Sequence, residues 1–227
     1  MRYTHTYRML LILLLIVVLL LLNLLLGSVS IPAQSIWNIL TGTGNEPVSW
    51  QNIVWKSRLP QALTALAAGA GLAVSGLQMQ TVFRNPLAGP SVLGISSGAS
   101  MGVAFVILLS GSLGGVALSR LGVMGEIALS VAAIIGSLSV MALIVYVSQK
   151  VKGNVTLLII GVMIGYVSNA VIGVLKFFSV EEDIRAYVIW GLGSFSRVSG
   201  NQMMLFVTLM AISLPLSFLL IKTLNLM

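Results

Sequence analysis

The stretch Arg84-Asn85-Pro86-Leu87-Ala88, followed by Pro90 and by Leu93-Gly94-Ile95-Ser96-Ser97-Gly98-Ala99, separates two long apolar segments of the chain. Pro86 and Pro90 break helix geometry, and the small residues after them allow backbones to pack closely. Transporters place gates and substrate contacts at breaks of this kind between membrane helices. The stretch therefore predicts a functional turn between two membrane-spanning helices.

The composition is that of a polytopic membrane protein. The chain has 227 residues, a mean hydropathy of +1.07, 58% hydrophobic residues and only 7% charged residues, whereas a soluble domain carries about 25% charged residues. The formal charge is +7, but the basic residues stand singly between apolar runs, which indicates membrane topology rather than nucleic-acid binding. The sequence has no cysteine, which excludes disulfides, thiol chemistry and cysteine metal sites.

Six apolar runs approach the roughly 20 residues that cross a bilayer. We predict an all-α membrane protein, a polytopic helical bundle with about six transmembrane helices, in one domain over residues 1–227. Arg2 and Arg8 precede the first run, which is typical of a signal peptide or a signal anchor, and the length of the run favours an uncleaved anchor. Because these two arginines precede the run and no Lys or Arg follows it until Lys56, we expect a cytoplasmic N-terminus. The runs are residues 9–29, 59–82, 92–109, 123–147, 155–178 and 203–220.

Small residues four positions apart mark close helix contacts in membranes. Such pairs occur in the second, third and fifth runs, so we expect these three spans to form a tight core, with the leucine-rich first span facing lipid. After the fifth run, Ser179 and Glu182 fit a capping box. A short helix over residues 184–192 would follow, either at the outer mouth of the bundle or as a plain surface connection. The pairs are Gly69/Ala73, Gly71/Ser75, Gly94/Gly98, Gly98/Gly102 and Gly161/Gly165.

Motifs for catalysis are absent from the sequence. No G-x-x-x-x-G-K-[ST] is present, so the chain does not itself cradle ATP phosphates. The lone His5 has no companion ligands, and no clustered His, Cys or carboxylates lie within the spans. We therefore expect no catalytic residues, no metal site and no cofactor.

Several ordered segments together resemble the FecCD-type permeases, the membrane subunits of ABC importers for iron–siderophores, haem and vitamin B12. The resemblance covers about residues 35–227. Its segments are Arg58-Leu59-Pro60, Ala67-Ala68-Gly69-Ala70-Gly71-Leu72-Ala73-Val74-Ser75-Gly76, Gln78, Gln80, the stretch from Arg84 to Ala99, Leu158-Ile159-Ile160-Gly161-Val162 and Trp190-Gly191-Leu192-Gly193-Ser194-Phe195.

The resemblance implies a multi-pass protein of the inner (cytoplasmic) membrane and a set of partners. Family members have ten spans and work as a permease pair, here a homodimer or heterodimer with a second permease copy. Two cytoplasmic ABC ATPase subunits hydrolyse ATP, and a periplasmic or lipoprotein substrate-binding protein delivers the chelate. Membrane lipid is the remaining partner, and no nucleic acid is expected. The sequence leaves open which chelate is carried.

The resemblance also implies roles for individual residues. Arg58 meets an acidic residue on the binding protein, and Lys56 supplies a charge that the family places at the position of Gln61. The cytoplasmic gate combines the turn of Asn85, Pro86 and Leu87 with the segment Gly153, Asn154 and Val155. Asn169, Tyr187 and Trp190 line the pathway.

The length departs from the family pattern. Similar proteins continue beyond Asn225-Leu226 into a cytoplasmic coupling segment and four more spans, so this permease domain is expected to be truncated at its C-terminal end. The alternative function is a truncated, non-transporting remnant, or half of a split permease, that acts only as a membrane binding partner.

Overall fold

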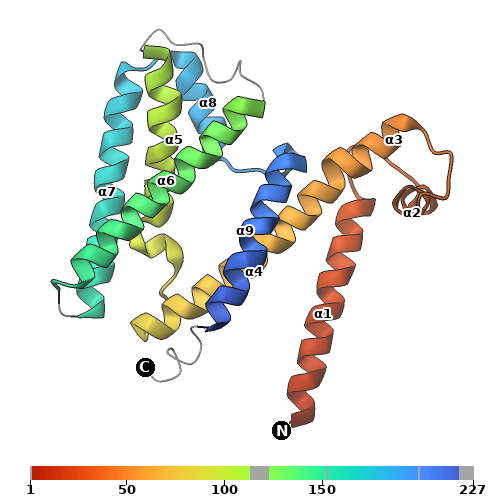
Figure 1. Cartoon of the computed structure of the whole chain (residues 1–227), viewed down its shortest axis with the longest axis horizontal. Coiled ribbons are helices and arrows are strands. Elements are labelled where there is room, and N and C mark those ends of the chain that lie inside the picture. Colours follow the sequence, from red (N-terminus) through yellow and green to blue (C-terminus); the bar gives the residue numbers. More distant parts are fainter. Residues whose placement is uncertain (1, 113–122, 152, 199, 220–227) are drawn as a thin grey trace. The chain divides into compact units, whose positions relative to one another are not determined.

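The computed structural model describes residues 2–112, 123–151, 153–198 and 200–219, and within these ranges every regular element is a helix (Figure 1). The predicted all-α membrane fold is confirmed. The elements in chain order are α1 (Arg2–Leu25), α2 (Ala33–Thr41), α3 (Val48–Ile53), the π-helix η1 (Val54–Arg58), α4 (Leu59–Phe83), the 3₁₀-helix η2 (Pro90–Leu93), α5 (Ile95–Ser112), α6 (Val123–Ser148), α7 (Asn154–Phe178), α8 (Glu181–Gly191), the 3₁₀-helix η4 (Phe195–Arg197) and α9 (Gly200–Leu219).

Five helices in the described part of the chain are long and apolar enough to cross a membrane, and each matches a predicted span. They are α1, α4 with the α3–η1 segment before it, α6, α7 and α9. The span predicted at residues 92–109 is shorter, because its apolar helix covers Ile95–Leu109. Residues 90–93 form η2 instead, and Gly94 adopts a left-handed backbone with φ of 74° that ends it. About six membrane helices remain consistent with this arrangement.

The chain divides into two compact units. Unit 1 comprises residues 1–70 and 194–213, and unit 2 comprises residues 71–193 and 214–227. The elements of each unit are described separately below. The prediction of one domain over the whole chain stays a prediction.

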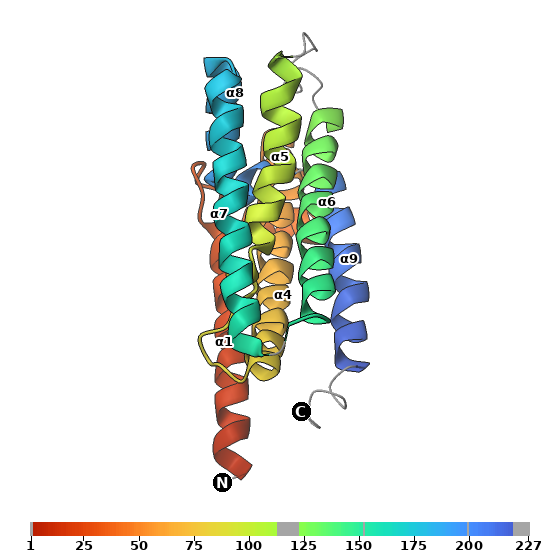
Figure 2. The ribbon, with the colours of Figure 1, turned by 90° about the vertical axis from the view of Figure 1, so that its left-hand side faces the viewer.

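Glycine contacts hold the helix group of unit 2 together, in which α5 packs against α6 and α7 (Figures 1 and 2). A Cβ on Gly98 would lie 2.7 Å from the carbonyl oxygen of Gly136 on α6. A Cβ on Gly102 or Gly136 would overlap the facing backbone outright. The predicted close contacts of Gly94, Gly98, Gly102 and Gly161 are therefore confirmed, because these residues let helix backbones touch.

The predicted tight core lacks one member, because α6, the fourth span, also packs on α5. The second span takes part through the end of α4, where Met79 and Phe83 pack against the cluster of Leu93, Val140 and Ile144. A Cβ on Gly69 of α4 would meet nothing within 4 Å, and the same holds for Gly76. Small residues permit a close contact but do not create one; a matching glycine on the facing helix, here Gly136, decides where it forms.

The capping box predicted at Ser179 and Glu182 is also wrong. Helix α8 begins at Glu181, three residues before the predicted start, and Val180 occupies its N-cap without a side-chain hydrogen bond. The Ser179 hydroxyl instead donates to the carbonyl oxygens of Leu108 at 3.1 Å and Leu175 at 2.6 Å. The contact with Leu108 ties the end of α7 to α5.

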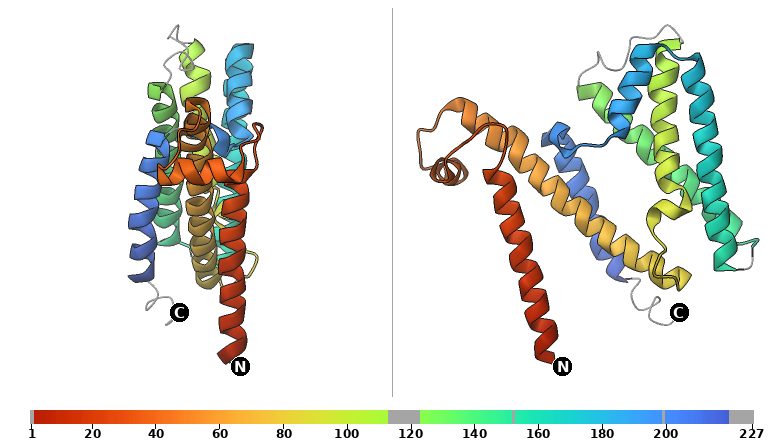
Figure 3. Two further views of the ribbon diagram at one scale, coloured as in Figure 1. Left: turned by 90° about the vertical axis from the view of Figure 1, so that its right-hand side faces the viewer. Right: turned by 180° about the vertical axis from the view of Figure 1, so that it is seen from behind.

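In unit 1, helix α1 ends beside the junction of α3 and α4 (Figure 3). Most α1 side chains are exposed, as expected for a lipid-facing span. The connection between α1 and α4 has its own small apolar cluster, which holds α2 and η1 together. Its buried members are Ile31, Ile36, Ile39 and Val54.

Candidate functional site

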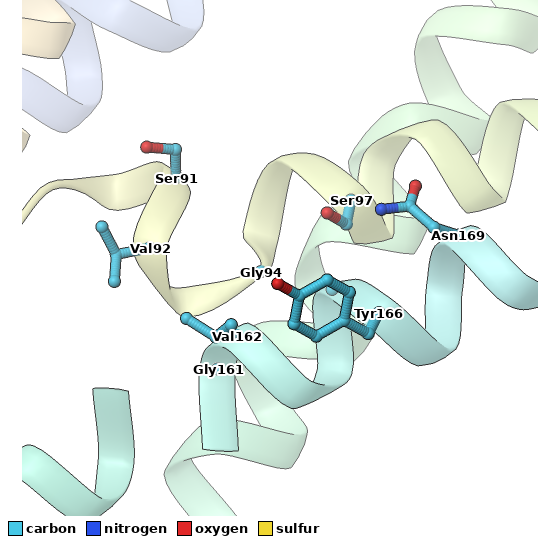
Figure 4. A pocket seen from close by; sticks show the side chains of 9 residues that line it. Ser91, Val92, Gly94, Ser97, Gly161, Val162, Tyr166 and Asn169 are labelled. Carbon is cyan, nitrogen blue, oxygen red and sulfur yellow. The ribbon is translucent and has the colours of Figure 1, made fainter. Parts of the chain in front are cut away.

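A pocket of about 310 Å³, with both polar and apolar lining, lies in unit 2, where η2 and the start of α5 face α7 (Figure 4). Figure 4 shows Ser97 on the α5 side of the pocket, with Tyr166 and Asn169 on the α7 side. The two helices thus supply opposite walls of one hollow. The pocket is lined by Ser91, Val92, Gly94, Ser97, Gly161, Val162, Gly165, Tyr166 and Asn169.

Glycines produce this pocket by allowing two backbone segments to approach each other. A Cβ on Gly94 would lie 2.7 Å from the Gly161 carbonyl oxygen, and a Cβ on Gly161 would lie 2.7 Å from the Cα of Leu93. One turn further along α7, a Cβ on Gly165 would lie 3.4 Å from Ser97 Oγ. Side chains at these positions would push η2 away from α7 and fill the hollow. Gly94 is required for a second reason, because its φ of 74° favours glycine.

The lining offers neutral hydrogen-bonding groups beside aliphatic surface. Ser91 and Ser97 carry hydroxyls, Tyr166 a phenol and Asn169 an amide, and no lining residue is charged. Hydrogen bonds to such neutral groups are roughly half as strong as those to charged groups. A pathway needs binding that is favourable enough for entry and weak enough for exit. The pocket therefore suits transient contact with a partly polar solute better than tight retention.

The turn that was predicted as a gate closes helix α4 with a Schellman motif. The amides of Arg84 and Asn85 donate to the carbonyl oxygens of Thr81 at 3.2 Å and Gln80 at 3.1 Å. Arg84 takes the left-handed position of this motif, with φ of 47°. Asn85 Oδ1 then accepts a hydrogen bond of 2.9 Å from the amide of Leu87. These bonds fix a tight turn before η2.

The side chain of Leu87 stands at the tip of this turn and is 85% exposed. Pro86, which precedes it, is also exposed, whereas Ala88 is buried immediately after it. Pro90 begins η2, which packs against α7 and supplies Ser91 and Val92 to the pocket. The predicted gate turn is thus joined to one wall of the pocket by a few residues of chain.

The second predicted gate segment begins helix α7. Gly153 is its N-cap, with a φ of 117° that favours glycine, and α7 starts at Asn154. The side chain of Val155 is exposed. Eight residues after Gly153, the same helix contributes Gly161 to the pocket. The gate role of both segments stays a prediction.

The three residues predicted to line the pathway divide into two groups. Asn169 lines the pocket, whereas Tyr187 lies in an apolar core with Val103, Ala104, Ile107, Leu108 and Ile172, and Trp190 packs against that core. The Lys176 ammonium lies 4.8 Å from the centroid of the Tyr187 ring. Burial raises the pKa of the Tyr187 hydroxyl, and a hydrogen bond with the Ser100 side chain partly offsets this. In this chain Tyr187 and Trp190 hold α8 onto α5.

One pocket residue with distinctive chemistry, Tyr166, was missed by the sequence analysis. A usable signal existed, because Gly161, Gly165 and Asn169 are spaced four apart and share one face of α7. Tyr166 follows Gly165 directly. The glycine pair was interpreted only as a packing element, although a backbone approach at two glycines also creates a hollow beside it.

The residues predicted to meet a binding protein differ in their accessibility. Lys56 is exposed on η1, whereas Arg58 is only 5% exposed. The Arg58 guanidinium donates to the carbonyl oxygens of Leu24 at 2.6 Å and Leu25 at 3.1 Å, and also to that of Val29. Docking by either residue stays a prediction, but only Lys56 of the two is exposed.

These features define a class: a multi-pass helical membrane protein with an uncharged, partly polar pocket beside a proline-containing turn. The FecCD transport family model matches residues 14–227, and the chain belongs to this family. It is a multi-pass protein of the inner (cytoplasmic) membrane.

The relatives carry transport names. The hemin transport system permease protein HmuU of Yersinia pestis is 34% identical over 203 residues, which are 89% of this chain and 57% of the relative. The vitamin B12 import system permease protein BtuC of Pectobacterium atrosepticum is 34% identical over 176 residues, 75% of this chain and 50% of the relative. The chain thus spans about half the length of these curated relatives.

A solved structure has the same fold. It is a chain of a proposed metal-chelate type ABC transporter in an inward-facing conformation, with a TM-score of 0.73 and 29% sequence identity. The match covers 94% of the present chain and 61% of the solved one.

Proposed function

We propose that the chain acts as a transmembrane permease subunit of an ABC importer that moves a metal chelate of the haem, iron–siderophore or cobalamin kind across the inner membrane. A separate ATPase supplies the energy, a binding protein delivers the chelate, and a second permease copy completes the pathway. Membership of the FecCD family and the named substrates of the relatives support this function. The observation that carries it structurally is the pocket between η2–α5 and α7, whose lining is uncharged and partly polar.

In this proposal α7 provides the surface along which the chelate passes. Tyr166 and Asn169 present a phenol and an amide that can exchange hydrogen bonds with the polar edge of a chelate, while Val162 contacts its apolar part. Because none of these groups is charged, the chelate leaves as readily as it enters. The turn of Asn85, Pro86 and Leu87 closes the cytoplasmic side, and any movement of the turn is transmitted through η2 to the wall formed by Ser91 and Val92.

The test of the pocket is uptake by the assembled transporter, with its ATPase and binding protein, in proteoliposomes. Haem, cobalamin and a ferric siderophore are offered separately. Tyr166→Ala and Asn169→Ala should each lower the uptake rate of one chelate severalfold without lowering the amount of folded protein. Phe177→Ala is the matched control, because Phe177 is an exposed aromatic residue of α7 outside the pocket.

The outcomes separate the alternatives. Wild-type rates in both pocket variants would remove the pathway role from this face of α7. No uptake of any of the three chelates, with the partners still bound, would instead favour the non-transporting binding-partner function.

The gate is tested by leak in the same proteoliposomes without ATP. Leu87→Ala removes the exposed tip, and Asn85→Ala removes the acceptor that orders the turn, so both should raise passive leak of the chelate. Leu77→Ala is the control, because Leu77 is an exposed leucine on α4 away from the turn. A leak equal to that of the control in both variants would mean that the turn is only structural.

A further inference from the structure

The buried guanidinium of Arg58 joins two elements that are far apart in the sequence. Its three acceptors are the carbonyl oxygens of Leu24, Leu25 and Val29, more than 28 residues earlier in the chain. Leu24 and Leu25 are the last residues of α1, and Val29 lies in the segment that leads to α2. Arg58 itself is the last residue of η1, directly before α4.

The end of α1 needs such a donor. The last four carbonyl groups of a helix have no partner within the helix, and an unpaired carbonyl is costly where water is scarce. The same carbonyls carry the negative end of the helix dipole, which a cation stabilises. No basic residue occurs in the last turn of α1, so Arg58 supplies from a distance what the helix lacks locally.

The facing backbone fits the guanidinium. A Cβ on Gly27 would lie 2.8 Å from Arg58 Nη2 and 3.1 Å from Cζ, so the guanidinium occupies space that any other residue at position 27 would fill. On its own side, Arg58 ends a π-helix, a wide turn that often occurs at functional positions. Val54, the first residue of that turn, is fully buried in the apolar cluster of unit 1. Both sides of the contact are thus held in place.

We propose that Arg58 is a positioning residue: it ties the end of α1 to the start of α4 and so holds the connection on which Lys56 is exposed. The link to binding-protein docking rests on the proposed function, whereas the link between the two helices does not. In this arrangement the positive charge of Lys56 contacts the binding protein, and Arg58 fixes the position of the segment that carries Lys56. Gly27 contributes to the same contact by leaving room for the guanidinium, which would have to shift if position 27 carried a Cβ.

The first experiment measures the geometry of unit 1 without any partner. The chain has no cysteine, so Leu14→Cys and Leu66→Cys introduce two unique labelling sites at exposed positions of α1 and α4. Spin labels on this pair in proteoliposomes give a distance distribution by pulsed electron paramagnetic resonance. Arg58→Gln should raise the fraction of molecules outside the main distance peak about tenfold, the loss expected for hydrogen bonds to a charged group. Gly27→Ala should raise the same fraction by a smaller factor, because it displaces the guanidinium without removing it.

Gly76→Ala is the matched control for Gly27→Ala, since a Cβ on Gly76 meets nothing within 4 Å; its distribution should equal that of the unsubstituted chain. Lys56→Glu should also leave the distribution unchanged. An unaltered distribution in Arg58→Gln, or in Gly27→Ala, would overturn the positioning role.

The second experiment measures association of the binding protein with the assembled transporter. Lys56→Glu should weaken association at least about tenfold, the scale of one close charge pair. If Arg58→Gln weakens association while the spin-label distances stay unchanged, Arg58 docks directly and the positioning role fails. If no form of the transporter binds the protein but the distances still broaden in Arg58→Gln and Gly27→Ala, the proposed function fails and the positioning role stands.

Discussion

The α5–α6–α7 group of unit 2 and the α1–α4 connection of unit 1 are held together in opposite ways. In the first, glycines remove side chains so that helix backbones touch, as at Gly98 and Gly136. In the second, one long cationic side chain, Arg58, reaches across to the carbonyl groups at a helix end. Both regions use glycine. In unit 2 a glycine lets a neighbouring helix backbone approach, whereas in unit 1 Gly27 leaves room for the Arg58 side chain.

The difference follows from the solvent. Lipid provides no hydrophobic drive for helices to associate, so van der Waals contact along matched small residues is what binds α5 to its neighbours. Most side chains of helix α1 are exposed among the described residues. Its end can still be fixed, because unpaired carbonyl groups strongly favour a hydrogen-bond donor.

The largest effect is expected from filling the glycine contact. Gly136→Val places a branched side chain against the backbone of Gly98 and Gly102, and overpacking of this kind costs about 3 kcal/mol. Unfolding in mixed detergent micelles measures the loss. Gly173→Val is the control, because a Cβ on Gly173 meets nothing within 4 Å. Equal losses in the two variants would mean that backbone contact does not hold this group together.

A smaller loss is expected in the apolar cluster of unit 1. Val54 is fully buried there, and Val54→Ala removes two methyl groups and leaves a cavity, at a cost of about 2 kcal/mol. The exposed Val48 provides the matched control, and Val48→Ala should change the free energy of unfolding by less than about 0.5 kcal/mol. A Val54→Ala variant as stable as its control would show that the cluster contributes little beside Arg58.

Asp183 is a second buried ionisable residue, and it contrasts with Arg58 because one of its carboxyl oxygens has no hydrogen-bond partner among the described residues. It is 7% exposed, and its Oδ2 has no hydrogen-bond partner among the described residues. Burial first, and the neighbouring Glu182 carboxylate second, raise its pKa above 3.8. The folded state therefore holds this proton more tightly than the unfolded state, so the stability present below pH 3.8 is lost as the pH rises through the raised pKa.

Melting temperatures measured against pH check this expectation. Asp183→Asn should flatten that fall and be at least as stable as the unsubstituted chain at neutral pH. Glu181→Gln, at an exposed position of the same helix, should keep the slope. A slope that persists in Asp183→Asn would assign the pH dependence to another group.

The smallest effect is expected at the end of α4. Arg84 has a left-handed backbone conformation, which costs a residue with a Cβ about 1 kcal/mol. Arg84→Gly should stabilise the turn by up to that amount in a thermal unfolding experiment, whereas Arg84→Ala should not. A gain in Arg84→Ala as large as in Arg84→Gly would locate the effect in the arginine side chain rather than in the backbone.

Local signals predicted the elements well and their partners poorly. The spans follow from length and hydropathy alone, and the turn at Asn85 and Pro86 follows from residue chemistry. Ser179 shows the limit: its spacing to Glu182 fits a capping box, but carbonyl groups from α5 and α7 take its hydroxyl. A local rule holds only while no distant group competes for the same atom.

The site was predicted in part for the same reason. The resemblance implied a pathway role for both Asn169 and Tyr187, but only Asn169, a polar residue within a span, lines the pocket, whereas Tyr187 packs in the core. A polar residue within an apolar run can be recognised from the sequence alone. The direction in which an aromatic side chain points depends on which helix lies beside it.

The sequence by itself determined that this is an all-helical membrane protein of the FecCD family with a proline-containing turn between two spans, because hydropathy, helix-breaking residues and ordered motifs are properties of contiguous residues. Tertiary structure alone decided that Gly136 faces Gly98, that η2 and α7 enclose a pocket, and that Arg58 binds the end of α1. Each of these contacts joins two segments that are distant in the sequence. Which backbones touch, and which donor binds a carbonyl group, therefore depends on the segment that faces them in the fold.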